Sequence, residues 1–283
     1  MQIAVVGTGA IGSTFAFHLA QAGHAVTVIA RGARLAQLER DGAVVLSTGE
    51  RAAVSARPAL DATTPWDLVL VTVRASQVDA VLPSLAASAA RTVMFMFNTF
   101  EPLDRLRDAV GAARFAFGFP AVIATLADGR LTREIVPRGQ ITTVTDAAWA
   151  QRFTDAGIRS VVHDDLHSWL RTHAVLVVPV LAIAAVAGPR GAGVTWAEAR
   201  THAQAMSAGF ALVRHLGQAI TPAPMVTLSR LPTAVVTALL WALSRTKTVR
   251  DLAAAGPGEA RTLIDQMAAA APAEAAPLVA IRP

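Results

Sequence analysis

Cysteine and tyrosine are absent from this chain of 283 residues, and lysine and asparagine occur once each, as Lys247 and Asn98. Without cysteine the protein has no disulfide bonds and no thiolate ligands for a metal ion. Because lysine is so rare, Lys247 is the only side chain that could form a Schiff base. It stands among serine, threonine and arginine residues, so we interpret it as an ordinary solvated lysine.

Charge of one sign is not concentrated anywhere along the chain. Basic residues outnumber acidic ones by 25 to 20, which gives a net charge of +5. No run of basic residues alternates with aromatic residues, so the sequence does not predict a nucleic-acid-binding groove. A modest positive charge suits an anionic cofactor or a small anionic substrate.

Apolar runs of transmembrane length are also missing, although 53% of the residues are hydrophobic. The longest run in the middle of the chain without an ionisable residue is 174–189, which has sixteen residues. A spanning helix needs about 20 apolar residues. No basic stretch precedes the first apolar run, as it would in a signal peptide. We therefore expect a cytoplasmic protein with no membrane partner.

The first 160 residues alternate between strand-like and helix-like segments. Short apolar runs predict strands, and helical periodicity follows the first of them at 12–22. This alternation is typical of an α/β fold with a doubly wound parallel sheet of the Rossmann type. The strands are expected at Gln2–Val6, Ala25–Ile29, 68–73, 92–97, 116–124, 139–144 and 159–162.

The second part of the chain is dominated by long apolar stretches with helical character. Helices are expected at 165–187, 195–219, 231–246 and 258–271, and glycine- and proline-containing turns separate them. The alanine- and proline-rich tail from Ala271 predicts a loosely ordered end. We therefore divide the chain into a Rossmann domain, 1–163, and an all-helical domain, 164–283. The apolar helices could also form a homodimer interface.

The strongest motif lies directly after the first strand, as Gly7-Thr8-Gly9-Ala10-Ile11-Gly12. In a dinucleotide-binding loop, Gly7 permits the tight turn, Gly9 lets the backbone approach the pyrophosphate, and Gly12 lets the helix pack on the strand. The first helical residues, with Ala10 and Ile11, present free N–H groups to the phosphates. The alternative is a glycine-rich turn that binds no ligand.

The end of the second strand indicates which dinucleotide is bound. An NAD-binding unit has an acidic residue there to accept a hydrogen bond from the ribose 2′-hydroxyl. This chain has Arg31, nineteen residues after Gly12, with Arg34 three residues further on. A guanidinium binds a 2′-phosphate through paired hydrogen bonds, so the pattern favours NADP. The alternative is that Arg31 is simply a solvated arginine.

Several segments beyond this loop carry a family resemblance: Ala30-Arg31-Gly32, the run 68–77 with Arg74, Phe97-Asn98, and Ser168-Trp169-Leu170-Arg171. With the phosphate loop, they make the chain resemble the ketopantoate reductase family. The resemblance implies a Rossmann domain, a helical domain, and reduction of a 2-oxo acid by NADPH in the cleft between them. It also implies that Arg74 lies near the cofactor and that Asn98 orients cofactor and substrate.

The departures from the family pattern lie mainly in the second half. The position of the family's catalytic lysine is Arg171, and Val175 stands where the family has an asparagine. The family's substrate-binding glutamate corresponds to Leu263, and Thr99 replaces a glycine. Arginine stays protonated above pH 12 and is a poor proton donor. We therefore expect a substrate less polar than ketopantoate, bound near Val175 and, by a looser similarity, Ser244.

Three histidines, His163, His167 and His173, gather where the two domains join in sequence. His167 precedes Arg171 by four residues, so both lie on one helical face, and its unperturbed pKa suits a proton donor. A solvated histidine near a helix start is the alternative. The cluster has no carboxylate at ligand spacing, so no metal site is predicted.

Two functions remain open from the sequence. The first is an NADP-dependent oxidoreductase acting on a carbonyl or imine of a small molecule, with Asn98, Arg171 and His167 as candidate catalytic residues. The second is a non-redox protein that uses the NADP-binding fold as a binding module or for a different reaction. The intact phosphate loop favours the first, and the replaced family residues favour the second.

Overall fold

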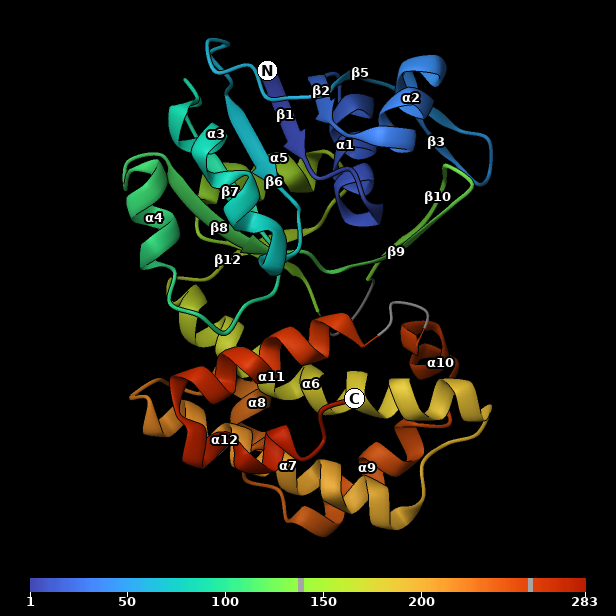
Figure 1. The fold of residues 1–283 in the computed structure, drawn as a ribbon, viewed down its shortest axis with the longest axis vertical. Coiled ribbons are helices and arrows are strands. Elements are labelled where there is room, and N and C mark those ends of the chain that lie inside the picture. Colours follow the sequence, from blue (N-terminus) through green and yellow to red (C-terminus); the bar gives the residue numbers. More distant parts are fainter. Residues whose placement is uncertain (137–139, 254–256) are drawn as a thin grey trace. The chain divides into compact units, whose positions relative to one another are not determined.

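The computed structural model describes residues 1–136, 140–253 and 257–283, and the chain divides into two units (Figure 1). The N-terminal unit comprises Met1–Asn98 and Leu103–Leu166. The helical unit comprises Thr99–Pro102 and His167–Pro283. The short segment Thr99–Pro102 thus belongs to the helical unit, although its neighbours on both sides belong to the N-terminal one.

An eight-stranded sheet forms the centre of the N-terminal unit, in the order β12-β11-β8-β7-β6-β1-β2-β5. All neighbouring strands are parallel except β8 and β11. The predicted α/β class, with a parallel sheet followed by a helical unit, is confirmed. The strands are β1 (Gln2–Val6), β2 (Ala25–Ile29), β5 (Ser55–Arg57), β6 (Leu68–Val71), β7 (Val93–Met96), β8 (Phe115–Phe119), β11 (Thr142–Val144) and β12 (Ser160–Val162).

Helices cover both faces of this sheet, which explains why every side chain of β6 and β7 is buried. Right-handed crossovers place α1 on one face and α3 and α4 on the other (Figure 1). Phe15 of α1 meets Phe153 of α5 edge to face at 5.3 Å between ring centres. The helices are α1 (Ala10–Gln21), α2 (Gly32–Asp41), the 3₁₀ helix η1 (Ala75–Ala80), α3 (Leu82–Ala87), α4 (Asp104–Val110) and α5 (Ala147–Asp155).

A second, four-stranded sheet, which was not predicted from the sequence, packs on α1. Its order is β4-β3-β10-β9, from β3 (Ala43–Leu46), β4 (Arg51–Ala53), β9 (Val122–Ala127) and β10 (Arg130–Ile135). The single strand expected at 116–124 is in fact two strands, β8 and β9, in different sheets. Pro120 lies between them, and proline interrupts a sheet ladder because it has no N–H donor. The expected strand 139–144 is β11 from Thr142, and Gly139 lies outside the described residues.

The helical unit is built around α7, which packs against α9 and α12. The predicted loose end at Ala271 is wrong: α12 follows there, and its Ala275 and Leu278 are buried. Small and apolar residues at helical spacing anchor this last helix despite its proline content. The helices are α6 (Leu166–Arg190), α7 (Trp196–His215), α8 (Ala223–Leu228), α9 (Thr233–Leu243), α10 (Lys247–Ala253), α11 (Gly258–Ala270) and α12 (Pro272–Val279).

By length and composition α6 could cross a membrane, and among the described residues it is the one helix that meets this test. In its most apolar window, however, 67% of the residues are buried inside the protein. Such burial is typical of a core helix, which passes the same test of length and hydropathy.

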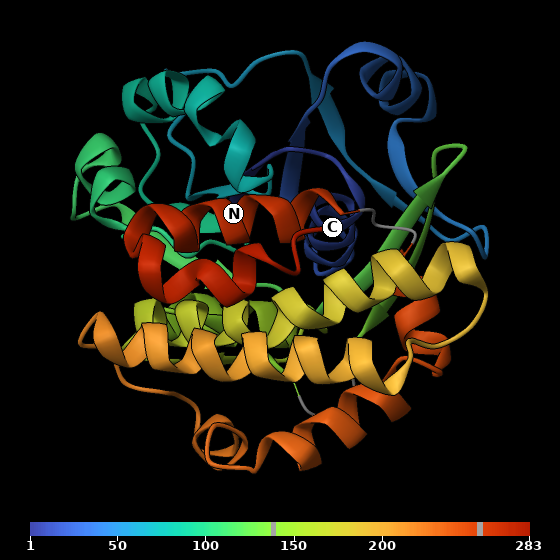
Figure 2. The same ribbon diagram turned by 60° about the horizontal axis from the view of Figure 1, so that its bottom comes forward.

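Helices α6 and α7 lie side by side (Figure 2). Their close approach depends on one glycine. Val175 of α6 is completely buried and faces Gly209 of α7. A Cβ atom on Gly209 would lie 2.8 Å from a methyl carbon of Val175, closer than carbon atoms can pack. The absence of a side chain therefore sets the distance between the two helices.

Replacing this glycine should destabilise the protein. We expect Gly209→Leu to lower the free energy of unfolding by about 1–3 kcal/mol through overpacking, despite the higher helix propensity of leucine. Gln204→Leu, at an exposed position of the same helix, should change it by less than about 0.5 kcal/mol. Urea unfolding of both variants tests this, and equal stability of Gly209→Leu and the wild type would contradict it.

Candidate functional site

The phosphate loop connects β1 to α1 and is packed tightly against the end of β6. Gly7 has φ +97°, and a Cβ there would lie 2.7 Å from the Val73 nitrogen. A Cβ on Gly12 would lie 2.1 Å from the Gly7 oxygen and 2.4 Å from the Thr72 hydroxyl oxygen. Thr72 Oγ1 also donates a hydrogen bond to the Gly7 carbonyl at 2.6 Å. Gly7 and Gly12 are therefore required by the fold itself.

Gly9 differs from these two glycines. It is the N-cap of α1, it is exposed, and a Cβ added there would meet no atom within 4 Å. Ala10 and Ile11 follow it in the first turn of α1 and are half-buried. The N–H groups of a first helical turn have no partner within the helix, and the helix dipole favours an anion there. The open space around Gly9 thus fits a bound phosphate group.

Arg31 and Arg34 have different environments, although both lie at the start of α2. Arg31 is the N-cap of α2, it is exposed, and no described residue holds its guanidinium by a hydrogen bond or an ion pair. Arg34 is half-buried and donates to Thr8, Ser13, Gln37 and Gly129. Burial lowers the pKa of Arg34 from its ordinary value. Only Arg31 is thus available to an external anion without breaking existing bonds.

Two further predicted residues lie at the same edge of the sheet. Arg74 follows β6, is exposed, and its backbone N–H donates to Gln77 Oε1 at 3.2 Å as η1 begins. Asn98 follows β7 and is half-buried. The strands β1, β6 and β7 are parallel neighbours, so Gly7, Arg74 and Asn98 all follow strand ends at one edge. The carboxyl edge of a parallel sheet is where ligands of such folds bind.

In the helical unit, Arg171 is buried and is held against Phe100. Its Nε donates to the Phe100 carbonyl at 3.0 Å, and its guanidinium carbon lies 5.0 Å from the centre of the Phe100 ring. Gln266 Oε1 accepts a hydrogen bond from the Phe100 N–H at 2.8 Å. Burial lowers the pKa of Arg171 from its ordinary value, but a guanidinium remains protonated at any physiological pH. Arg171 therefore carries a fixed positive charge within the helical unit.

The two histidines near Arg171 have different surroundings. His167 is half-buried, and its Nδ1 lies 3.0 Å from Gln218 Nε2. His173 stacks on Trp169 at 5.1 Å between ring centres, and burial lowers the pKa of His173 to about 4. His173 is therefore neutral near pH 7 and cannot donate a proton as an imidazolium there. Of the two, only His167 is a reasonable acid.

The remaining residues of the predicted substrate pocket lie in the packed core. Val175 is completely buried, and Leu263 is 1% exposed. Ser244 is also 1% exposed, and its hydroxyl donates to the Trp241 carbonyl and accepts from the Val194 N–H. In this structure these three side chains are almost completely buried among protein atoms, and their predicted contact with a substrate stays a prediction.

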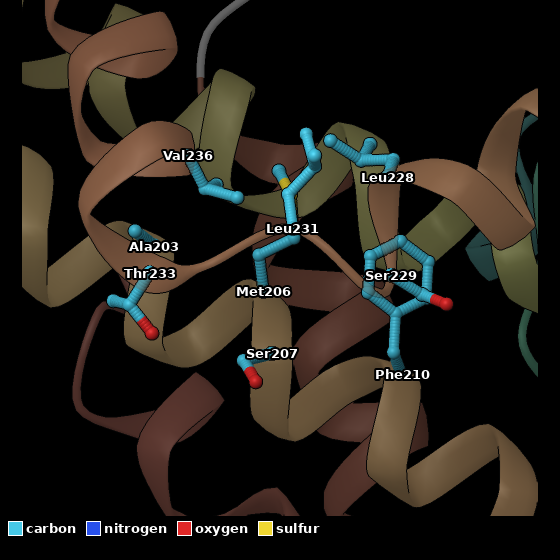
Figure 3. Close-up of a pocket in the computed structure, with 9 residues that line it drawn as sticks. All are labelled: Ala203, Met206, Ser207, Phe210, Leu228, Ser229, Leu231, Thr233 and Val236. Carbon is cyan, nitrogen blue, oxygen red and sulfur yellow. The ribbon is translucent and has the colours of Figure 1, made fainter.

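A small surface hollow in the helical unit lies elsewhere, between α7, α8 and α9 (Figure 3). It has room for about one water molecule, and none of the residues predicted for the site lines it. Within residues 1–136, 140–253 and 257–283, no three histidine, aspartate or glutamate side chains gather in a way that could hold a metal ion. The hollow between α7, α8 and α9 is lined by Ala203, Met206, Ser207, Phe210, Leu228, Ser229, Leu231, Thr233 and Val236.

Comparison with known proteins relates the N-terminal part of the chain to a known family. Residues 3–139 match the model of the ketopantoate reductase PanE/ApbA family, and this stretch contains the phosphate loop, Arg31, Arg74 and Asn98. Over this stretch, which is slightly less than half of the chain, the protein is similar to the ketopantoate reductase family. Members of this family are NAD(P)H-dependent reductases that act on carbonyl compounds. The resemblance predicted from the sequence is thereby confirmed for this half.

Sequence similarity to a relative named as a 2-dehydropantoate 2-reductase covers only part of the chain. The 2-dehydropantoate 2-reductase of Vibrio cholerae is 34% identical over 134 residues. This match covers 46% of the present chain and 41% of the relative, which is less than half of either protein.

The likeness in fold to ketopantoate reductases extends over the whole chain. The PanE/ApbA family ketopantoate reductase from Ralstonia eutropha JMP134 has a TM-score of 0.75 at 22% identity, covering 100% of this chain and 97% of that one. D-Mandelate dehydrogenase in complex with NADH and anilino(oxo)acetate has a TM-score of 0.66 at 15% identity, with coverages of 100% and 98%. At identities of 22% and 15%, these likenesses establish the fold of the chain and nothing about its activity.

Several residues that hold the phosphate loop or Phe100 in place were not predicted from the sequence. Thr72 and Ser13 both hydrogen-bond to carbonyl groups of the phosphate loop, and Gln266 holds Phe100. Thr72 directly follows β6 and Ser13 follows the last glycine of the loop, so position along the chain could have indicated both. Nothing local marks Gln266, because its partner is far away in sequence.

The different packing of the glycines gives a clear test of the loop. Gly9→Val should lower the free energy of unfolding by only about 1 kcal/mol, the cost of an unfavourable N-cap residue, because its Cβ enters open space, while dinucleotide binding is lost. Gly12→Val should instead destabilise the fold through its clash with Thr72. Thermal unfolding and NADPH fluorescence separate the two effects. If Gly9→Val binds NADPH with wild-type affinity, the loop is only a structural turn.

Proposed function

We propose that the protein is an NADP-dependent oxidoreductase that transfers hydride between NADPH and a carbonyl or imine of a small molecule other than ketopantoate. The observation that carries this proposal is the state of Arg31. Its guanidinium is exposed and not engaged by the described residues, and it lies at the end of β2, where NAD-specific proteins have a carboxylate.

The bound cofactor supplies the hydride, and the N-terminal unit holds it. The N–H groups at the start of α1 bind the pyrophosphate, and the space beside Gly9 lets it approach the backbone. Arg31 binds the 2′-phosphate through charge-assisted hydrogen bonds. Arg74 and Asn98, at the same sheet edge, position the rest of the cofactor and the reacting group.

Arg171 provides the positive charge for the substrate. Its Nε is used by the Phe100 carbonyl, so the other nitrogens of the fork bind a substrate carboxylate or stabilise a developing oxyanion. The structure of D-mandelate dehydrogenase contains anilino(oxo)acetate, a carboxylate beside a carbonyl, which supports a 2-oxo acid as one substrate class. The proton then comes from water or from His167, one helical turn before Arg171.

A non-redox role on the same fold is favoured by the core positions of the helical unit. Val175 and Leu263 are buried, and they stand at the two positions that the family resemblance relates to substrate binding. Titrating the protein with NADPH, and then measuring NADPH consumption over a panel of 2-oxo acids, ketones and imines, separates the alternatives. Binding without consumption would favour the non-redox role.

We also propose that the protein acts on a small molecule in the cytoplasm and that it assembles as a homodimer.

The assignment of Arg31 predicts a change in cofactor preference. Arg31→Ala should weaken NADPH binding about 10- to 150-fold, which corresponds to the loss of about 1.5–3 kcal/mol from a charge-assisted pair. NADH binding should stay within about twofold, because NADH has no 2′-phosphate. Fluorescence titration with both cofactors tests this, and an equal loss for the two would remove Arg31 from this role.

The assignment of Arg171 predicts how activity depends on this side chain. With a carboxylate substrate, Arg171→Ala should raise KM about 10- to 150-fold, since a hydrogen bond to a charged group contributes about 1.5–3 kcal/mol. Arg171→Lys keeps the charge and adds a titratable donor, so its pH–rate profile should differ from that of the wild type.

A matched control for Arg171 is Gln266→Leu, which removes another hydrogen bond to Phe100 and keeps Arg171. If this control reproduces the rise in KM, the effect comes from loosening Phe100 and not from the lost charge. Full activity of Arg171→Ala would show that Arg171 is an ordinary structural residue.

A further inference from the structure

The side chain of Arg34 lies against the phosphate loop, on the side of its Thr8 carbonyl. Its Nε donates to that carbonyl at 3.3 Å, and its Nη2 donates to Ser13 Oγ at 2.8 Å. The Ser13 hydroxyl in turn donates to the same Thr8 carbonyl at 3.3 Å. One carbonyl oxygen of the loop therefore accepts hydrogen bonds from two side chains, one of them charged.

This anchoring fixes the orientation of the following N–H group. The peptide bond between Thr8 and Gly9 is planar and trans, so its C=O and N–H point in opposite directions. With the Thr8 oxygen held by Arg34 and Ser13, the Gly9 N–H points away from Arg34. Gly9 is exposed, with open space around it, so this donor is directed by residues that do not themselves face the ligand.

The other end of Arg34 is held by the turn between β9 and β10. Asp128 and Gly129 have φ values of +48° and +75°, typical of a two-residue hairpin turn. The Gly129 carbonyl accepts hydrogen bonds from Gln37 Nε2 at 3.0 Å and from Arg34 Nη1 at 3.4 Å. Gln37 Oε1 accepts another from Arg34. A Cβ on Gly129 would lie 2.0 Å from Gln37 Nε2, so the turn and α2 are in direct contact.

We propose that Arg34 is a positioning residue: it holds the Thr8–Gly9 peptide so that the Gly9 N–H is directed at the cofactor pyrophosphate, and Gln37 and the β9–β10 turn hold Arg34 in place. Arg34 does not bind the 2′-phosphate, in contrast to the expectation from its spacing to Arg31. The second sheet thereby supports the phosphate loop. The identity of the ligand rests on the proposed function. The hydrogen bonds of Arg34 to Thr8, Ser13, Gln37 and Gly129, which together form the Arg34 brace, do not.

The two roles of Arg34 predict different cofactor affinities. Arg34→Met should weaken the binding of NADPH and NADH by the same factor, about 5- to 30-fold, because both contain the pyrophosphate. The ratio of the two affinities should stay at its wild-type value. Arg40→Met is the matched control, since Arg40 is on the same helix with a side chain 69% exposed, and it should bind both cofactors like the wild type. A loss for NADPH alone, or no loss for either, would overturn the proposal.

Hydrogen exchange of the ligand-free protein tests the brace independently of any cofactor. Arg34→Met should speed amide exchange in residues 8–13 and 127–130 at least fivefold, and exchange in α4 should not change. Gln37→Leu, which keeps Arg34, should also speed amide exchange in residues 127–130. This variant provides the test if Arg34→Met fails to fold. Unchanged exchange in these segments would overturn the brace. Failure of the wild type to bind either cofactor would overturn the proposed function, and the exchange data would still decide the role of Arg34.

Discussion

The close packing of the phosphate loop on the end of β6 is the constraint on which the site depends. Thr72 donates to the Gly7 carbonyl, and the space that side chains would fill at Gly7 and Gly12 is occupied by β6 and by the loop itself. This contact fixes where α1 begins, and therefore where its free N–H groups lie. The second sheet and the α2 side chains then pack around a helix whose start is already determined.

The sequence predicts those parts of the fold that depend on local patterns. The glycine spacing and the buried runs of β1, β2, β6 and β7 are such patterns, and they predict the loop and the parallel sheet correctly. The second sheet is not local: β3 pairs with β10, which is distant along the chain. The environment of Arg34 is not local either. Its position in the sequence suggests a role beside Arg31, whereas the direction of its side chain is set by the distant turn at Gly129.

In the helical unit, similarity of sequence predicts a role for Arg171 but does not predict which residues surround it. Its hydrogen-bond partner, Phe100, comes from the loop after β7, and Gln266 holds the same residue from α11. Ser244 matched a serine-containing stretch of the family, yet its hydroxyl is used entirely within the unit. A matching position along a chain does not determine which way a side chain faces, because neighbouring helices decide that by packing.

The assignment of Thr99–Pro102 to the helical unit affects how this protein can be divided. The chain passes between the units after Asn98, after Pro102 and after Leu166, so one cut cannot separate them. A fragment ending at Leu166 would retain Phe100 but lose Arg171 and Gln266, and its completely buried ring would face water. Chimeras that exchange helical units between relatives therefore need to carry this four-residue segment together with the C-terminal part.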